Sequence, residues 1–152
     1  MKKKTEWNNL STNKSAGRLY FIEDTYEAGL VLAGTEVKSI RRGGANLKDA
    51  YCEISSGEIF ISNMHISPYE EGNIYNLDPK RKRKLLMHKS EIRRLEKVKT
   101  LQGYTIIPLR LYLVRGRVKA EIATARGKKL YDKREDMAKK DAERRMKKSL
   151  DY

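Results

Sequence analysis

Alternating apolar and polar positions mark the middle of the chain as mostly β-strand. From Ala50, every second side chain of residues 47–54 is apolar, and residues 59–66 resume a strand pattern after a turn at Ser55–Glu58. Gly57 is the only glycine of this turn, so we expect it to supply any positive φ that the turn needs. Two strand patterns joined in this way predict a β-hairpin.

A second hairpin is predicted where residues 104–114 and 117–124 flank Arg115–Gly116. Apolar and charged side chains alternate along residues 117–124, which indicates one buried face and one face in water. That pattern is typical of an antiparallel sheet. Pro108 has no backbone N–H to donate, so we expect it at a sheet edge or a bulge.

Two short helices are expected between the strands. Thr35 is a candidate N-cap for a helix that Gly43–Gly44 ends, and Ser90 is the candidate cap of another that stops before Gly103. Several short strands with small helices favour a mainly β fold, closed into a small antiparallel barrel. The OB-type barrel is one such fold, and it commonly binds nucleic acid.

Composition divides the chain into a polar N-terminal segment (1–18), the β-rich body (19–125) and a charge-dense basic tail (126–152). The tail mixes both signs of charge with few apolar residues, so it cannot pack a core of its own. We predict a tail that is disordered when free and helical when bound to RNA. Tyr131 within it can stack on a base or pack against the body, and the sequence leaves both roles open.

Net charge points to an anionic partner. The 152 residues carry 34 Lys and Arg against 20 Asp and Glu, a formal charge of +14, which destabilises a compact state through self-repulsion. No apolar run approaches the ~20 residues that span a bilayer, and no signal-peptide core follows Met1–Lys4. We therefore expect a cytoplasmic protein that binds nucleic acid and has no membrane partner. Five consecutive cations at 80–84 are predicted to contact phosphates, the alternative being a solvated charge run.

Candidate catalytic residues are few. The single cysteine, Cys52, is expected to be a buried hydrophobe. His65 is expected on a strand face beside Ile59 and Ile61, and His88 at the entry of a helix. Neither histidine has a motif partner for a catalytic triad. We predict no catalytic residues and no enzyme activity.

Metal and cofactor sites are not expected either, because ligands do not cluster in the sequence. The nearest approach to a cluster is Glu70, Glu71 and Asp78. A metal-dependent nuclease using these three carboxylates is the enzyme alternative, and intact RNA with and without magnesium would remove it.

Six motifs carry a family resemblance, and they are Thr12–Asn13–Lys14, Tyr26–Gly29, Gly34–Arg41, Asn63–Tyr69, Asp78–Leu86 and Gly127–Arg134. Together, and in this order, they resemble the SsrA-binding protein family. The resemblance covers nearly the whole chain. It implies a closed, OB-like, six-stranded antiparallel barrel with short helices.

The resemblance also implies partners: a monomer that binds the transfer-RNA-like part of transfer-messenger RNA and delivers it to stalled ribosomes for trans-translation. It places the RNA-binding residues at Asn13, Lys14, Glu27, Leu86, Lys119, Lys128 and Lys129. It implies that the tail enters the empty mRNA channel of the small subunit near the decoding centre, through Tyr131, Asp132, Lys133 and Arg134.

Elementary chemistry suits those roles. Lys119 lies on the strand face expected in water and can contact phosphate, while Glu27 can accept hydrogen bonds from base or sugar donors. Leu86 can pack against an unstacked base or within the core. The alternative binding function is a generic single-strand or ribosomal OB-type RNA-binding protein, which would bind without preference for a transfer-RNA-like shape.

Overall fold

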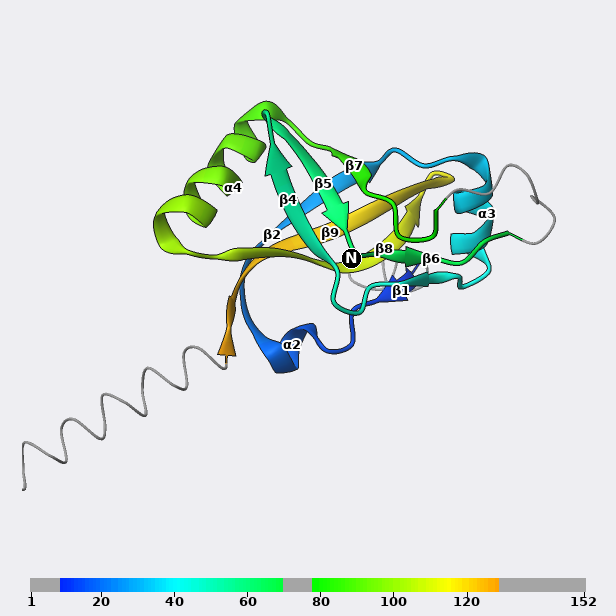
Figure 1. Cartoon of the computed structure of the whole chain (residues 1–152), viewed down its shortest axis with the longest axis horizontal. Coiled ribbons are helices and arrows are strands. Elements are labelled where there is room, and N and C mark those ends of the chain that lie inside the picture. Colours follow the sequence, from blue (N-terminus) through cyan, green and yellow to red (C-terminus); the bar gives the residue numbers. More distant parts are fainter. Residues whose placement is uncertain (1–8, 70–77, 129–152) are drawn as a thin grey trace, which may run out of the picture.

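The computed structural model describes residues 9–69 and 78–128 (Figure 1). In chain order, their elements are β1 (Asn9–Thr12), α2 (Ala16–Leu19), β2 (Tyr20–Leu30), α3 (Gly34–Arg41), β3 (Ala45–Asn46), β4 (Tyr51–Ser55), β5 (Glu58–Ser62), β6 (His65–Ile66), β7 (Arg83–Leu86), α4 (Lys89–Gln102), β8 (Thr105–Val114) and β9 (Arg117–Gly127). This confirms a mainly β fold with short helices.

Seven strands form one antiparallel sheet in the order β1-β8-β9-β2-β7-β5-β4, and β3 pairs with β6 in a separate ribbon. The three longest strands, β2, β8 and β9, are neighbours and cross the molecule together (Figure 1). Helix α4, which connects β7 to β8 along the chain, packs at one end of the sheet, and α3 lies at the other end.

The predicted closed barrel of six strands is wrong for the described residues, because the sheet is open and has seven strands. Its edge strands β1 and β4 do not pair. Although β4 packs beside β8, both edges of β8 are already bonded to β1 and β9. The free side of β1 meets β3 through one side-chain hydrogen bond, from Ser11 Oγ to the Ala45 carbonyl at 3.1 Å, rather than through a ladder.

Both predicted hairpins are confirmed, as β4–β5 and β8–β9. The tight turns use two residues with positive φ each: Ser56 (52°) with Gly57 (76°), and Arg115 (52°) with Gly116 (77°). Two consecutive positive φ values match the right-handed twist of the strands that they join. Glycine therefore supplies only the second of the two left-handed positions.

The strand expected over 59–66 is interrupted. Because Asn63 adopts a φ of 61°, the chain leaves β5 after Ser62 and enters β6. His65 then pairs opposite Asn46 of β3 and does not continue the face of β5. The expectation that His65 shares a strand face with Ile59 and Ile61 is therefore wrong.

The bulge expected at Pro108 is confirmed. The β8–β9 register passes from Pro108 opposite Ile122 directly to Arg110 opposite Glu121, which leaves Leu109 without a partner on β9. The missing N–H of proline is thus placed where the ladder is already broken.

The start of α3 differs from the prediction. Ala33 is its N-cap, and Thr35 lies inside the first turn. The Ala33 N–H donates to Glu36 Oε1 at 3.0 Å, so the acid three positions later satisfies the N-cap backbone. The predicted end is confirmed, since Gly43 adopts a φ of 84° just after the helix.

The same device starts α4. His88 is the N-cap in place of Ser90, and its N–H donates to Glu91 Oε1 at 3.2 Å. The role of His88 at a helix entry is confirmed. At the other end, Gly103 takes the left-handed conformation that closes the helix.

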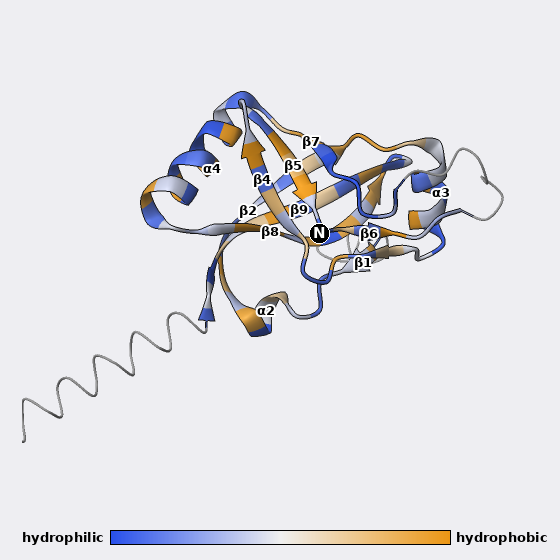
Figure 2. Cartoon of the chain, viewed as in Figure 1, coloured by the Kyte–Doolittle hydropathy of each residue, from blue (hydrophilic) through white to orange (hydrophobic). Residues whose placement is uncertain are grey.

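The apolar core draws on the sheet and on both longer helices. Five of its fully buried side chains are Ile40, Ile59, Leu95, Leu111 and Ile122. Figure 2 shows apolar stretches along β4 and β5, whereas α4 is largely hydrophilic. None of the helices in the described ranges is long and apolar enough to cross a membrane.

Cys52 is buried in this core, as predicted. Burial raises the pKa of its thiol well above the usual range, which keeps it protonated. A protonated, inaccessible thiol is a weak nucleophile. Cys52 is therefore part of the packing.

Candidate nucleic-acid interface

Arg81 and Arg83, from the basic run 80–84, turn toward one buried carboxylate. Arg83 Nη2 lies 2.7 Å from Glu36 Oε2, and Arg81 pairs with the other oxygen, Oε1. Arg83 also donates to the carbonyls of Met64 (2.7 Å) and Pro79 (3.0 Å). The guanidinium groups of these two arginines therefore bind partners within the protein and join α3 to the basic run.

The ionisation of Glu36 follows from this cluster. Burial alone would raise the pKa of Glu36, but hydrogen bonds from Arg81, the Ala33 N–H and Arg83 outweigh it and hold the pKa below its usual range. Glu36 is thus a carboxylate at neutral pH, although only 4% of its surface is exposed.

Two lysines of the run are also paired within the protein. Lys82 Nζ lies 2.7 Å from Glu53 Oε2, and Lys84 Nζ lies 3.1 Å from Glu58 Oε1. Four of the five cations at 80–84 therefore have carboxylate partners in the described structure. The predicted contact of this run with phosphates receives little support from this geometry, because the acids on α3, β4 and β5 already offset its charge.

Three of the candidate RNA-binding residues meet in one hollow, where β2 lies between β7 and β9. Gly29 of β2 pairs with Leu86 on one side and Lys119 on the other, and Glu27 lies two positions before it on the same face. Lys119 Nζ is 3.9 Å from Glu27 Oε1, and 53% of Leu86 is exposed. Met87, the N-cap His88 and Glu91 complete the lining.

Gly29 keeps this hollow open. A Cβ at this position would lie 3.3 Å from Leu86 Cβ, closer than side chains ordinarily approach. The exposure of Leu86 excludes one of its two predicted roles, packing within the core. Its side chain lies at the surface beside a carboxylate and an ammonium group, whereas the neighbouring Leu85 is buried.

Tyr112 and Arg110, which belong to no motif that the sequence marks as functional, support Glu27 from β8. The Tyr112 hydroxyl donates to Glu27 Oε2 at 2.7 Å, while the Arg110 guanidinium lies 4.3 Å from the Tyr112 ring centroid. Burial, together with this hydrogen bond, raises the pKa of Tyr112. The tight turn at Arg115–Gly116 contained the signal, because counting back from it places Tyr112 opposite Lys119.

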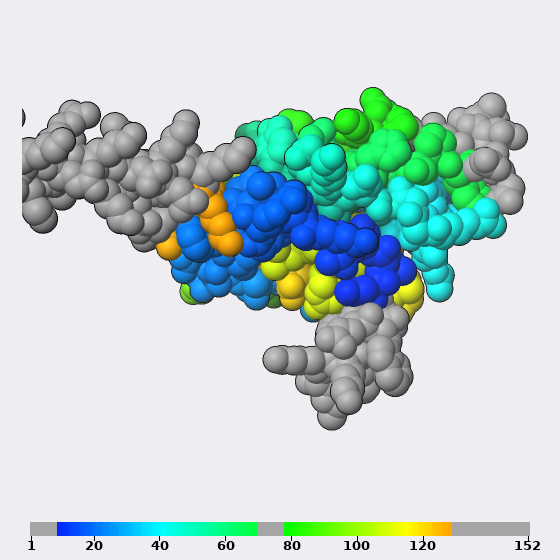
Figure 3. All heavy atoms as spheres, turned by 90° about the horizontal axis from the view of Figure 1, so that it is seen from below, coloured from blue at the N-terminus to red at the C-terminus, as the bar shows by residue number. Residues whose placement is uncertain are grey.

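Asn13 and Lys14 lie in a separate hollow, at the turn between β1 and α2. Figure 3 shows this N-terminal segment in blue between the yellow strands β8 and β9 and the cyan residues after α3. The Asn13 amide donates to the Pro108 carbonyl at 3.0 Å, and its backbone N–H donates to Leu109 at 2.8 Å. Asn13 thus fixes the turn against the β8 bulge and leaves Lys14 exposed.

Lys128 joins the end of β9 to α2. Its Nζ donates to the Gly17 carbonyl at 2.7 Å and lies 5.1 Å from the Phe21 ring centroid. The other tail candidates lie outside the described residues, and they are Lys129, Tyr131, Asp132, Lys133 and Arg134.

Little supports the nuclease alternative. Glu70 and Glu71 lie outside the described ranges, and Asp78 Oδ1 accepts a hydrogen bond from the Lys80 N–H at 2.9 Å. Within residues 9–69 and 78–128, no three His, Cys, Asp or Glu side chains group as metal ligands would.

Fold and surface together define a small, basic, antiparallel β protein whose hollow combines a fixed carboxylate, an ammonium group and an exposed leucine. Such a combination suits a polyanion that also offers hydrogen-bond donors. A family model described as SmpB protein matches residues 10–152. The chain belongs to the SmpB, or SsrA-binding protein, family.

Relatives cover almost the full length of the chain. An SsrA-binding protein from Clostridium botulinum is 63% identical over 146 residues, which make up 96% of this chain and 94% of that protein. One from Caldicellulosiruptor saccharolyticus is 57% identical over 141 residues, with 93% and 89% covered. A solved structure described as "tmRNA-SmpB: a journey to the center of the bacterial ribosome" has a TM-score of 0.66 and 45% identity, and covers 77% of this chain and 82% of its own.

Proposed function

We propose that this protein binds the transfer-RNA-like part of transfer-messenger RNA and delivers that RNA to stalled ribosomes for trans-translation. The relatives support this, because they are SsrA-binding proteins and the similar solved structure joins tmRNA, SmpB and the ribosome. The role is that of a binding partner without catalytic chemistry, and it places the protein in the cytoplasm, where ribosomes translate.

The observation that carries the proposal is the fixed carboxylate of Glu27 beside Lys119. Cations alone attract any RNA, whereas a carboxylate repels phosphate and accepts only from base or sugar donors. The hydrogen bond from Tyr112 holds Glu27 in place before RNA arrives. A preset acceptor next to a cation favours one RNA shape over others.

The other candidate residues take complementary roles in this proposal. Lys119 and Lys14 contact phosphates, Leu86 packs against an unstacked base, and Asn13 positions the turn that carries Lys14. Lys128 and Lys129 extend the cationic surface toward the tail.

We also propose a division of labour along the chain. The body (19–125), preceded by the segment 1–18, binds the transfer-RNA-like part. The tail (126–152) probes the empty mRNA channel near the decoding centre, through Tyr131, Asp132, Lys133 and Arg134. A cationic segment that folds only inside a vacant RNA channel would report that the channel is empty.

Competition binding tests the proposal. The transfer-RNA-like domain of transfer-messenger RNA competes with ordinary transfer RNA and with random RNA across a salt series. We expect a preference for the transfer-RNA-like domain that persists at high salt. Equal binding to all three, lost together as salt rises, would mean simple phosphate attraction and would favour the generic RNA-binding alternative.

Two variants refine the test. Glu27→Gln should reduce the preference for the transfer-RNA-like domain and leave the salt dependence of binding nearly unchanged. Lys119→Gln should weaken binding to all three RNAs alike and lower the slope of log affinity against log salt by about 1. Glu58→Gln, on β5, is the matched control for Glu27, because Glu58 is an exposed acid whose ion pair lies outside the hollow.

A further inference from the structure

Helix α4 presents a cluster of cations to solvent. Its apolar residues Ile92 and Leu95 are buried against the sheet. Its exposed residues include Lys89, Arg93, Arg94 and Lys97, which we call the α4 cations. Lys89, Arg93 and Lys97 follow one another at intervals of four residues, so they share one face and span ~12 Å along the axis.

The α4 cations differ from most other clustered cations of the body, because they have no carboxylate partner among the described residues. On the strands and just before β7, five cations each lie within 4 Å of a carboxylate: Lys82, Lys84, Lys119, Arg110 and Arg126. The four α4 cations form no ion pair with any described residue. Like charges four positions apart on a helix repel each other, and Lys89, Arg93 and Lys97 are spaced in this way.

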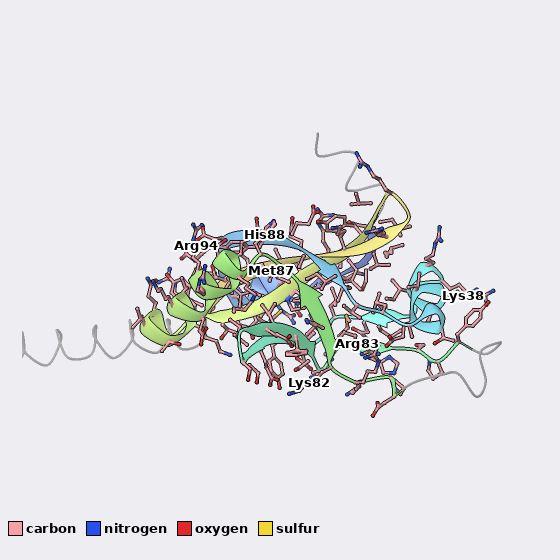
Figure 4. All side chains as sticks on the ribbon, turned by 90° about the horizontal axis from the view of Figure 1, so that it is seen from above. Lys38, Lys82, Arg83, Met87, His88 and Arg94 are labelled. Atoms are coloured by element: carbon pink, nitrogen blue, oxygen red, sulfur yellow. The ribbon has the colours of Figure 1, made fainter. Side chains whose placement is uncertain are left out.

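Position links this helix to the hollow. His88, its N-cap, and Glu91, in its first turn, both line the hollow that contains Glu27 and Lys119. Figure 4 shows Arg94 on the same side of the molecule as His88 and Met87. Lys89 directly follows the lining residue His88 in the chain, so the row of Lys89, Arg93 and Lys97 starts next to the hollow and runs away from it along the helix, on the face opposite Glu91.

We propose that the α4 cations bind the phosphate backbone of the transfer-messenger RNA, beyond the part seated in the hollow. This inference rests on the proposed function, because the RNA must first occupy the hollow. The backbone of that RNA then follows the helix axis, and the phosphates relieve the repulsion between the cations. Affinity comes from these contacts, while the choice between RNAs stays with Glu27.

Two matched double variants of the full chain test the proposal. Arg93→Gln with Lys97→Gln removes two α4 cations, and glutamine keeps the helix propensity. Lys38→Gln with Arg41→Gln removes two exposed cations from α3, at the other end of the sheet, with the same change in net charge. Binding to transfer-messenger RNA is measured across a salt series for both variants and the wild type.

The α4 variant should bind roughly tenfold more weakly at physiological salt, with a salt slope smaller by about 1.5. The α3 variant should stay close to the wild type. The exchange Arg93→Lys with Lys97→Arg keeps both charges and should bind like the wild type, which separates charge from effects on folding.

Equal losses in the α4 and α3 variants would mean that only net charge matters and would overturn the inference. So would an unchanged slope in the α4 variant, or lost binding in the charge-conserving exchange. If the wild type itself shows no preference for transfer-messenger RNA, the proposed function fails, whatever the variants do.

Discussion

Glu36 and Arg83 form a buried ion pair that joins α3 to β7. Arg83 Nε donates to Glu36 Oε2 at 2.8 Å, and only 1% and 5% of the Arg83 and Glu36 side chains are exposed. The pair also fixes the chain around β6, because Arg83 donates to the Met64 carbonyl. This pair thus helps to hold together two motifs that are far apart in sequence.

Loss of Arg83 should be strongly destabilising. Arg83→Met leaves the buried Glu36 carboxylate with only the partly exposed Arg81 as its cation, and removing one member of a buried pair costs about 3–5 kcal/mol. Urea unfolding measures the change. Glu36→Gln added to Arg83→Met should recover part of the loss, and Lys84→Gln, which breaks an exposed pair, should shift the midpoint much less. A stability of Arg83→Met equal to that of the wild type would contradict this role.

Stability in acid should depend on Glu36. Because its folded-state pKa is lowered, its contribution is fully present above the unfolded carboxyl pKa of about 4.3 and is lost as pH falls through the folded value. Glu36→Gln should be less stable than the wild type at neutral pH. The difference in stability between the two proteins should become smaller as the pH falls below about 4.3. Urea midpoints across an acid series measure it, and a gap that stays constant would exclude this linkage.

Tyr112 should act on RNA choice through Glu27. Tyr112→Phe removes the hydroxyl that holds the carboxylate, and one lost hydrogen bond is worth about 1 kcal/mol. We expect a severalfold smaller preference for the transfer-RNA-like domain in competition binding, with little loss of total affinity. Tyr104→Phe is the control, since Tyr104 contacts Arg126 through its ring. If Tyr112→Phe kept the preference for the transfer-RNA-like domain, the hydrogen bond from Tyr112 to Glu27 would not contribute to RNA choice.

Deletion of residues 131–152 should separate the two proposed functions. RNA binding by the body should remain largely intact, because the hollow and α4 lie within residues 9–128. Tagging on stalled ribosomes in a reconstituted translation reaction should be abolished. Lost RNA binding after the deletion would refute the division between body and tail.

Local pattern determined much of the fold. Both hairpins, the Pro108 bulge and the glycine helix ends were predicted, because turns, bulges and caps depend on residues that are neighbours in sequence. Because hydroxyl side chains are common helix caps, the sequence favours Thr35 and Ser90 as the helix starts. In the structure, Glu36 and Glu91 satisfy the backbone from inside the helix, a signal that was present in the sequence.

Only the tertiary structure decided which charges are available to a partner. The sequence shows five cations in a row at 80–84, but it does not show that Glu36, Glu53 and Glu58 come from other elements to pair with four of them. The family resemblance predicts Glu27, Leu86 and Lys119 as RNA-binding residues. Pairing of β2 with β7 and β9 brings these three into one hollow, where Tyr112 bonds to Glu27. The sheet is open because its edge strands β1 and β4 do not pair. Composition and periodicity thus determine the strands and the net charge, whereas pairing between distant residues decides where the charge remains free.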